Sequence, residues 1–343
     1  MSEKRTELEE IGEFGLIDQL TSSFANQKPS TLKGIGDDAA VIDIGGGNVQ
    51  LISTDMLVEG VHFNLMYMPL KHLGYKAIAV NLSDICAMNA TPEQVTVSIA
   101  VSNRFPLEAL EELYSGIKAA CENYSVDLIG GDTTSSYSGL VISVTAIGQA
   151  KKNDIVYRSG AKEHDLLVVS GDLGAAYMGL QVLEREKEVF QANPDIQPDL
   201  DGHDYIIQRQ LKPEARVDIL NFLKKLEVKP TSMIDISDGL ASEIFHLCKS
   251  STTGCRIYDE KLPIDGKTSM TAIDFNLDPA TCVLNGGEDY ELLFTVSQED
   301  YDKIAGNPHM TIIGHMTDVS EGVYFVDKNG SAIELRAQGW NHF

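Results

Sequence analysis

The chain has 343 residues, of which 43% are hydrophobic and 23% charged, a composition that suits two globular domains with sizeable cores. Its 51 acidic and 27 basic residues give a net charge of −24, and there is no run of Lys and Arg. Nucleic-acid binding needs a basic surface, so we exclude that class of function. An acidic protein would also repel an anionic substrate unless metal ions intervene.

No targeting or membrane-spanning segment is predicted. The N-terminal sequence MSEKRTELEE is polar, and no stretch approaches about 18 uninterrupted apolar residues. The five cysteines form no CxxC pair, which is typical of reduced thiols rather than of a disulfide framework or a zinc site. We therefore expect a cytoplasmic protein that does not bind a membrane.

The first 150 residues predict a unit of mixed helices and strands. A short amphipathic helix at 11–20 precedes two strands, 39–44 and 49–55, which flank the turn-forming sequence GGGN. The elements that follow are a helix at 70–88, a strand at 94–101, a helix at 106–124, a short strand with a glycine turn at 126–134, and a strand at 140–150.

The second half, from residue 151, also combines strands and helices. Segment 186–214 contains three prolines and is polar, so we interpret it as a loop or a helical excursion. The whole chain is thus predicted to be an α+β protein with two domains, residues 1–150 and 151–343. The elements of the second half are strand–turn–helix units at 165–183 and 231–249, and strands at 255–263, 290–297 and 310–316.

Acidic residues recur at the ends of the predicted strands. Asp84 is flanked by the apolar residues Leu82 and Ile85. A carboxylate in such a setting is costly to bury without a partner of opposite charge. Lys and Arg are almost absent beside these acids, Arg158 being the main exception, so either water or a bound cation must compensate them. The acids concerned are Asp37, Asp38, Asp55, Asp84, Asp132, Asp235, Asp238, Glu288 and Asp289.

These acids predict a magnesium site. Oxygen ligands without clustered His or Cys favour Mg²⁺ or Ca²⁺ over zinc or copper, and the spacing of a calcium-binding EF-hand is missing. Carboxylates spread over several strand ends suggest several Mg²⁺ ions, which in proteins commonly bridge to substrate phosphates. Gly130 and Gly131, next to Asp132, would let the backbone approach a phosphate closely. The indicated reaction class is phosphoryl transfer.

Each candidate residue also has a structural interpretation. For any single residue, the structural interpretation explains its presence as well as or better than a functional role. For all of the residues together it does not, so we favour the metal site. The motifs of P-loop enzymes, protein kinases, serine hydrolases and dinucleotide-binding proteins are absent. The structural interpretations are a solvated turn for Asp37 and Asp38, a plain turn for Asp132, helix capping for Asp235 and Asp238, a surface position for His62 and Arg158, and core packing for Tyr114 and Trp340.

The motifs resemble those of the thiamine-monophosphate kinase family, in order and over nearly the whole chain. AVNLSDICAMNA and GGEDYEL are the most specific of them. The wider superfamily includes aminoimidazole ribonucleotide synthetase, selenophosphate synthetase and the hydrogenase-maturation dehydratase. The similar segments are GIGDDAAVI, STDMLVEGVHF, YKAIAVNLSDICAMNATP, LIGGDTT, RSGAK, ISDGL, NGGEDYELLFT and the terminal GWNHF.

The resemblance implies a two-domain aminoimidazole ribonucleotide synthetase-like fold. Its N-terminal domain would be a mixed sheet with helices, used for ATP and Mg²⁺ binding and for dimerisation, and its C-terminal domain an α/β sandwich-like unit that completes the site. The implied partners are ATP, thiamine monophosphate, several Mg²⁺ ions and a second copy of the chain, whose N-terminal sheet would join the first in a barrel-like unit.

The resemblance also assigns site residues, motif by motif. The implied metal ligands are Asp38, Ser53, Thr54, Asp55, Asp84, Asp132, Asp235 and Asp238. Those at ATP are Tyr114, Gly131, Asp132, Arg158 and Ser237. Those at thiamine phosphate are His62, Glu288 and Trp340.

A direct, in-line phosphoryl transfer is the mechanism we expect. The attacking group would already be an anionic phosphate, so no residue is assigned as acid or base, and Asp84 and Asp132 are the most critical positions. Two alternatives remain. One is a synthetase of the same superfamily, and the other is an acidic Mg²⁺- or nucleotide-binding protein without catalysis.

Overall fold

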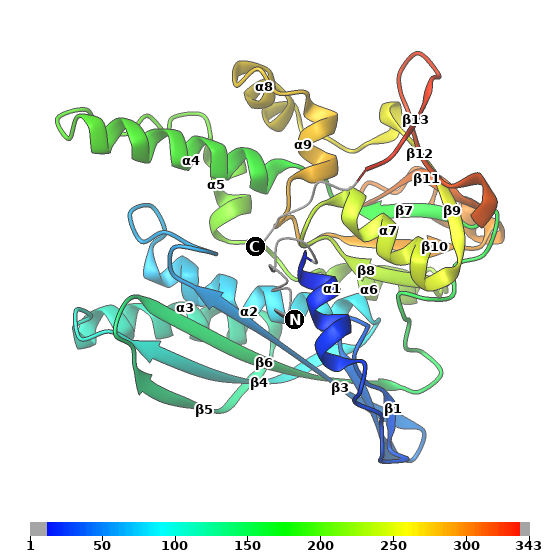
Figure 1. Ribbon diagram of the computed structural model, residues 1–343, viewed down its shortest axis with the longest axis horizontal. Coiled ribbons are helices and arrows are strands. Elements are labelled where there is room, and N and C mark those ends of the chain that lie inside the picture. Colours follow the sequence, from blue (N-terminus) through cyan, green and yellow to red (C-terminus); the bar gives the residue numbers. More distant parts are fainter. Residues whose placement is uncertain (1–11, 337–343) are drawn as a thin grey trace, which may run out of the picture.

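In the computed structural model, which describes residues 12–336, the chain forms two mixed sheets flanked by helices (Figure 1). The helices are α1 Gly12–Thr21, α2 Leu70–Ala87, α3 Leu107–Tyr124, α4 Ala175–Ala192, α5 Asp204–Leu211, α6 Val217–Lys225, α7 Leu240–Ser251, α8 Gly266–Asp274, α9 Pro279–Asn285 and α10 Tyr301–Ile304. The strands are β1 Thr31–Lys33, β2 Ala40–Gly45, β3 Asn48–Val58, β4 Thr91–Val101, β5 Asp127–Ser135, β6 Leu140–Lys151, β7 Leu166–Ser170, β8 Ser232–Asp235, β9 Thr253–Tyr258, β10 Leu292–Val296, β11 Met310–Asp318, β12 Val323–Val326 and β13 Ala332–Glu334.

The first sheet has six strands in the order β1-β2-β3-β6-β4-β5. All neighbouring pairs are antiparallel except β4 and β5, which are parallel. The predicted hairpin over GGGN is confirmed, since β2 and β3 pair on either side of it. One face of the sheet is covered by α2, and α3 packs against α2 (Figure 1).

The helices α2 and α3 approach each other closely because glycines face their crossing. A Cβ atom on Gly116 of α3 would lie 1.9 Å from the carbonyl oxygen of Lys71 in α2, so only glycine fits there. Apolar side chains of α2 such as Ile78, Leu82 and Ile85 are fully buried against the sheet. The predicted helix at 70–88 is therefore confirmed, and it forms part of the core.

The strand β5 corrects one prediction. A short strand with a glycine turn was expected at 126–134, whereas the strand runs through both glycines from Asp127 to Ser135. It lies at the sheet edge and pairs only with β4, with a register shift beside Thr96. A Cβ on Gly131 would lie 1.8 Å from the carbonyl oxygen of Val97, so this glycine permits strand pairing instead of turn formation.

The second sheet has seven strands in the order β13-β12-β9-β11-β7-β10-β8. The predicted strand–turn–helix at 231–249 is present as β8 and α7. Segment 186–214 is the helical excursion that was one of the two expectations, because α4 continues to Ala192 and α5 follows at Asp204. The helix α2 contacts β8 of this sheet as well as the first sheet, so it joins the two units.

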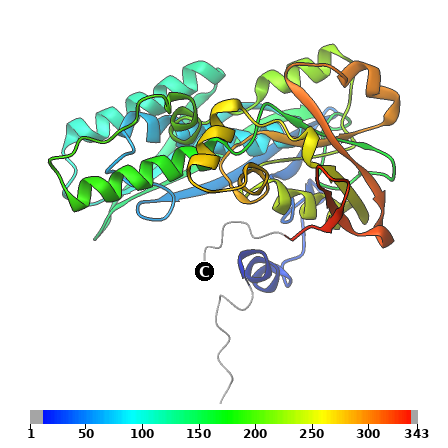
Figure 2. The ribbon, with the colours of Figure 1, turned by 90° about the horizontal axis from the view of Figure 1, so that it is seen from above.

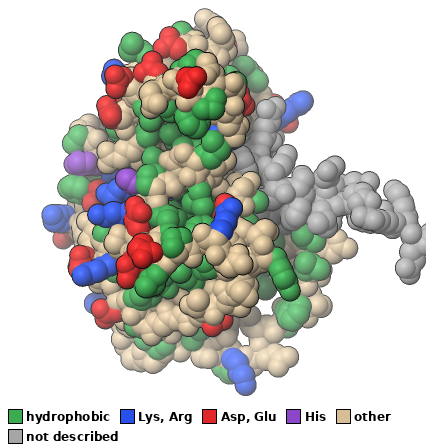
Figure 3. All heavy atoms as spheres, turned by 90° about the vertical axis from the view of Figure 1, so that its left-hand side faces the viewer, with side chains coloured by type: hydrophobic (Ala, Val, Ile, Leu, Met, Phe, Trp, Pro, Cys, Tyr) green, Lys and Arg blue, Asp and Glu red, His purple; other side chains and the backbone are tan. Residues whose placement is uncertain are grey.

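Figure 2 shows α1 beside the packed body rather than within it. Over residues 12–336, none of the helices has the length and apolar character to cross a membrane. On the side that carries the outer ends of α3 and α4, acidic and basic side chains are intermixed with hydrophobic ones (Figure 3).

Candidate active site

Three carboxylates converge where the two sheets meet. Asp38 precedes β2, Asp84 lies on the last turns of α2, and Asp235 is the final residue of β8. One oxygen of each lies within 4.8 Å of an oxygen of the other two. Asp38 and Asp235 are buried and Asp84 is partly buried. The sequence places these residues far apart, so only the fold makes them a single group.

Hydroxyl groups orient two of these carboxylates. The Ser53 hydroxyl of β3 donates a short hydrogen bond to Oδ2 of Asp84. The Ser83 hydroxyl of α2 donates to Oδ2 of Asp235 at 2.6 Å, across the boundary between the two sheets. Each of these two carboxylates thus has one oxygen held in position by a neighbouring hydroxyl group.

The convergence of like charges alters the acidity of these groups. Burial raises the pKa of Asp84 well above its usual value, and the charges of Asp55, Asp235 and Asp38 add to the effect. Burial, then the charge of Asp38, raises the pKa of Asp235 to about 7. Three ionised carboxylates are costly to hold together without a counter-ion, so the site favours a cation.

Asp37 and Asp38 have unequal environments. Arg158 donates from Nη2 and Nε to Oδ1 of Asp38, at 2.6 and 3.1 Å. Asp37 points away from the group, because its Oδ1 accepts from the backbone N–H of Arg158 at 3.1 Å and its Oδ2 lies 3.6 Å from Nζ of Lys33. Burial raises the pKa of Asp38 although Arg158 opposes this. Asp37 therefore shapes the loop, whereas Asp38 faces the cluster.

The donor set fits Mg²⁺. It consists of carboxylate and hydroxyl oxygens, with no His or Cys in the group. Oxygens around an octahedral Mg²⁺ lie about 3–4 Å apart, which is compatible with the observed spacing. In addition, Oδ2 of Asp38 is buried and has no hydrogen-bond partner within the described part of the chain. A bound cation would give this oxygen a partner.

The turn after β8 is held by a residue that the sequence analysis did not single out. Glu243 of α7 is buried, and its Oε1 accepts from the backbone N–H groups of Ser237 and Asp238 at 3.1 and 2.8 Å. Burial, followed by the charge of Asp238, raises the pKa of Glu243 strongly. The predicted helix capping by Asp235 or Asp238 is not observed, since Gly239 is the N-cap of α7 and no side chain caps it.

Asp55 joins the acidic group, but Thr54 and Asp132 lie elsewhere. The charge of Asp55 acts on Asp84, and its backbone N–H donates to Asn81 Oδ1 at 3.0 Å. The Thr54 hydroxyl donates to the carbonyl of Val144 at 3.0 Å, on the face of the sheet that α2 does not cover. Asp132 is exposed on β5, and three strand spacings, about 14 Å, separate β5 from β3.

Glu288 lies in a separate contact between the two units. Its Oε1 is 2.9 Å from Nζ of Lys76 in α2, and its Oε2 accepts from Nε2 of Gln210 at 2.5 Å. Lys76 has no exposed side-chain surface, whereas 26% of the Glu288 side chain is exposed. The contact anchors a loop whose backbone is strained, with φ of +66° at Glu288 and +51° at Tyr290.

The remaining candidates are not brought to the acidic group. His62 accepts at Nδ1 from the backbone N–H of Val58 at 3.0 Å, so it closes its own turn. Tyr114 is partly buried on α3 and packs against the first core, as its structural interpretation predicted. Trp340 lies outside the described residues.

No sequence pattern predicted the basic partners of Glu288 and Glu291. Lys76, Arg209 and Arg216 are buried or nearly so, and the last two bind Glu291 at the start of β10. These partners are more than 70 residues from their acids, so no local pattern joins them. Lys76 lies within an otherwise apolar run of α2. A lysine in such a run is the one local sign in the sequence that a buried cation needs an acidic partner.

Comparison with known proteins identifies the family. Residues 36–150 match the family described as AIR synthase related protein, N-terminal domain. Over 338 residues the chain is 34% identical to the thiamine-monophosphate kinase of Bacillus subtilis, covering 97% of this chain and 100% of that one. Over 336 residues it is 36% identical to the thiamine-monophosphate kinase of Aquifex aeolicus, covering 98% and 99%.

Solved structures confirm the expected fold. The structure of AaThiL complexed with AMPPCP and TMP has a TM-score of 0.84 and 33% identity, covering 99% of this chain and all of that one. Hydrogenase maturation protein HypE of Escherichia coli, at 18% identity and a TM-score of 0.69, shares the fold over 95% of this chain and 98% of its own. The aminoimidazole ribonucleotide synthetase-like α+β fold is therefore present, and the chain belongs to the thiamine-monophosphate kinase family.

Proposed function

We propose that this protein transfers the γ-phosphoryl group of ATP to thiamine monophosphate and forms thiamine diphosphate, a step of thiamine diphosphate biosynthesis. The observation that carries the proposal is the convergence of Asp38, Asp84 and Asp235 at the junction of the two sheets. Such a group suits a metal-assisted reaction between two anionic substrates. The likeness to a protein solved with AMPPCP and TMP supports the same substrate pair.

The proposed chemistry is direct and in line. The terminal phosphate oxygen of thiamine monophosphate attacks the γ-phosphorus, a new P–O bond forms, and the bond to the β-phosphate oxygen breaks to release ADP. The attacking oxygen is anionic already, so no general base is needed. Mg²⁺ ions bound at the site would screen repulsion between the substrates and neutralise charge on the leaving oxygen.

We assign the roles of the acidic group from its surroundings in the structure and the remaining roles from the family resemblance. Asp38, Asp84 and Asp235 would hold Mg²⁺, with Ser53 and Asp55 beside them. Asp238, fixed by Glu243, would add a further ligand, and Thr54 would take part only through its backbone carbonyl. Arg158, which pairs with Asp38, and Ser237 are proposed at the ATP phosphates. The family resemblance would place Gly131 and Asp132 at the phosphates too and Tyr114 by the nucleotide, but within one chain β5, which carries Gly131 and Asp132, lies four strands away from β2. His62, Glu288 and Trp340 are proposed at thiamine phosphate.

We further propose a homodimer built on the uncovered face of the six-stranded sheet. The edge strand β5 is exposed along all nine of its residues, and Met56 and Ile129 are 55% and 57% exposed. An uncovered sheet face with an open edge is a common association surface. A second copy there would enclose Asp132 and Thr54 in an interface.

We also propose that the activity is cytoplasmic. All five cysteines are free thiols, which is typical of a reducing compartment.

One assay tests the function. Purified protein is incubated with ATP, Mg²⁺ and thiamine monophosphate, and thiamine diphosphate and ADP are quantified. We expect equal amounts of the two products, and none when thiamine monophosphate or Mg²⁺ is omitted. ATP binding without turnover would favour a non-catalytic nucleotide-binding protein, and ADP release with an aminoimidazole ribonucleotide precursor alone would favour a synthetase; either result overturns the proposal.

A further inference from the structure

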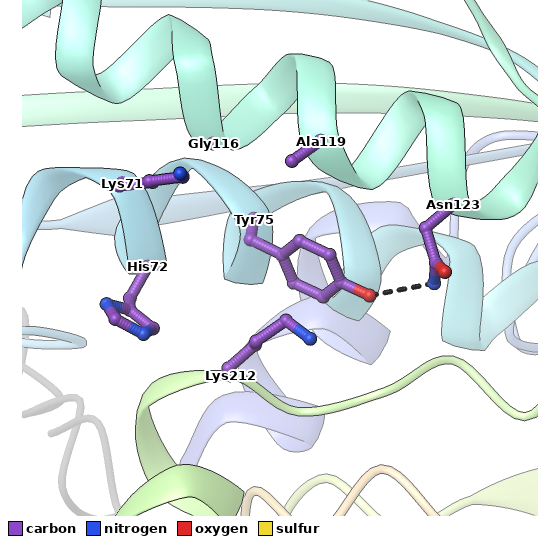
Figure 4. Close-up of a pocket in the computed structure, with 7 residues that line it drawn as sticks. All are labelled: Lys71, His72, Tyr75, Gly116, Ala119, Asn123 and Lys212. Atoms are coloured by element: carbon purple, nitrogen blue, oxygen red, sulfur yellow. Dashed lines mark hydrogen bonds between the residues drawn. The ribbon is translucent and has the colours of Figure 1, made fainter.

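A cavity lies away from the acidic group. It has a volume of about 410 Å³, in the range of small-molecule pockets, and lies between α2, α3 and the segment that follows α5 (Figure 4). His72, in its wall, is twelve residues before Asp84 on α2, a separation of about 18 Å along the helix axis. The side chains that matter below are Lys71, His72 and Tyr75 from α2, Ala119 and Asn123 from α3, and Lys212.

Three basic groups surround this cavity. Burial lowers the pKa of His72, and the charges of Lys212 and Lys71 lower it further, so the three groups are close enough to interact. Lys71 has no ion-pair partner, and Nδ1 of His72 is buried without a hydrogen-bond partner, within residues 12–336. Lys71 thus keeps an unpaired charge and His72 an unpaired ring nitrogen, and in a chain of net charge −24 these two groups mark a candidate site for an anion.

A nearby acid, Glu214, pairs with one of the three basic groups and leaves the other two without an acidic partner among residues 12–336. Glu214 does not line the cavity, and its Oε1 accepts from Nζ of Lys212 at 3.0 Å while its Oε2 accepts from the hydroxyl of Tyr75 at 2.7 Å. Tyr124 also donates to this carboxylate. Glu214 thus compensates the charge of Lys212 and fixes Tyr75 and Lys212 in position, with Nζ of Lys212 4.3 Å from the centre of the Tyr75 ring.

The cavity also offers apolar and polar surface for more than a bare anion. The Tyr75 ring lies at its centre beside Lys212, and Asn123 donates to the Tyr75 hydroxyl at 2.9 Å (Figure 4). Gly116 and Ala119 leave space on the α3 side. We propose that this cavity binds a small phosphate monoester, with its phosphate between Lys71, His72 and Lys212 and its organic group against Tyr75. This site is additional to the kinase site.

Binding to metal-free protein tests the proposal. With EDTA present, the acidic group repels anions, so the kinase site does not compete. The ring signals of His72 are followed by NMR during titration with inorganic phosphate and with phenyl phosphate, and are assigned by their loss in His72→Gln. We expect both probes to raise the pKa of His72 in a saturable manner, with phenyl phosphate binding more tightly.

Matched variants complete the experiment. Lys71→Gln removes an exposed charge and should weaken both probes about tenfold. Lys118→Gln, on the exposed face of α3 where Lys118 pairs with Glu122, should leave binding unchanged. Ala119→Leu should weaken phenyl phosphate more than phosphate. Absence of a saturable shift, equal affinity for the two probes, or equal loss in Lys71→Gln and Lys118→Gln would overturn the proposal. These readouts need neither ATP nor Mg²⁺, so they are independent of the kinase proposal.

Discussion

Lys76 and Glu288 form an ion pair in which the lysine has no exposed surface. Nζ of Lys76 lies 2.9 Å from Oε1 of Glu288 and 3.1 Å from the carbonyl oxygen of Gln210. The pair joins α2, which carries Asp84, to the loop before β10. A buried ammonium needs such partners because its desolvation is not otherwise offset. The contact therefore ties the acidic loop of one unit to the central helix of the other.

Lys76→Met should destabilise the protein and displace Glu288. It leaves Glu288 and the Gln210 carbonyl without their partner, which costs about 3 kcal/mol in the free energy of unfolding. The double variant Lys76→Met/Glu288→Leu should recover part of this loss, as measured by urea denaturation. Lys118→Met, which removes an exposed ion pair on α3, should cost less than about 0.5 kcal/mol. Strictly additive losses in the double variant would contradict a direct interaction.

Asp38→Asn and Asp84→Asn should abolish most activity while preserving the fold. Each removes one charge from the three-carboxylate group, so we expect turnover to fall by about 100-fold or more. Asp37→Asn is the matched control, because Asp37 binds backbone and Lys33 rather than the group. It should lose much less turnover. The measurements are ADP release and circular dichroism, and equal losses at Asp37 and Asp38 would argue against their unequal roles.

The metal-free protein should lose stability as the pH rises. Burial raises the pKa of Asp235 to about 7 in the folded chain, above its ordinary value of 3.8. Between these two values the folded state binds more protons than the unfolded state. The contribution to stability is thus complete below about pH 4 and is lost as the pH rises through 7. Urea denaturation in EDTA at pH 5.5 and 8 measures this, and added Mg²⁺ should restore stability at pH 8.

The Asp235→Asn variant provides the control for that pH dependence. A neutral amide removes the charge that is costly to bury, so the metal-free variant should be more stable than the parent at pH 8, by on the order of 2–4 kcal/mol. Its response to Mg²⁺ and its turnover should both be small. A variant that keeps the parent's full pH dependence would show that other groups cause it.

Gly131→Ala should displace β5, whereas Gly130→Ala should be tolerated. A Cβ on Gly131 would overlap the carbonyl oxygen of Val97, a backbone atom that cannot rotate away. The nearest atom to a Cβ on Gly130 is the Thr96 methyl group at 4.0 Å. We expect a loss of more than about 2 kcal/mol for the first substitution and less than about 1 kcal/mol for the second. Thermal unfolding distinguishes them, and similar melting temperatures would contradict the assigned close contact.

Local patterns were sufficient for most elements but not for β5. The helix at 70–88 and the GGGN hairpin each reflect forces that act within a few residues, and both predictions are confirmed. The pair Gly130 and Gly131 is compatible with a turn and with an edge strand, so the local sequence does not distinguish the two. Pairing with β4 decided between them, and that pairing joins segments more than 30 residues apart.

The sequence by itself determined the family, the acidic character and the residue types of the candidate site. Its motifs keep their order along the chain, and oxygen donors without clustered His or Cys favour Mg²⁺ or Ca²⁺ over zinc or copper, however the chain folds. Only the tertiary structure decided which acids meet. It gathered Asp38, Asp84 and Asp235, left Asp132 on an exposed strand, and paired Glu288 with a buried lysine. The reason is physical: burial and proximity set the energy of a charge, and both arise from contacts between residues distant in the chain.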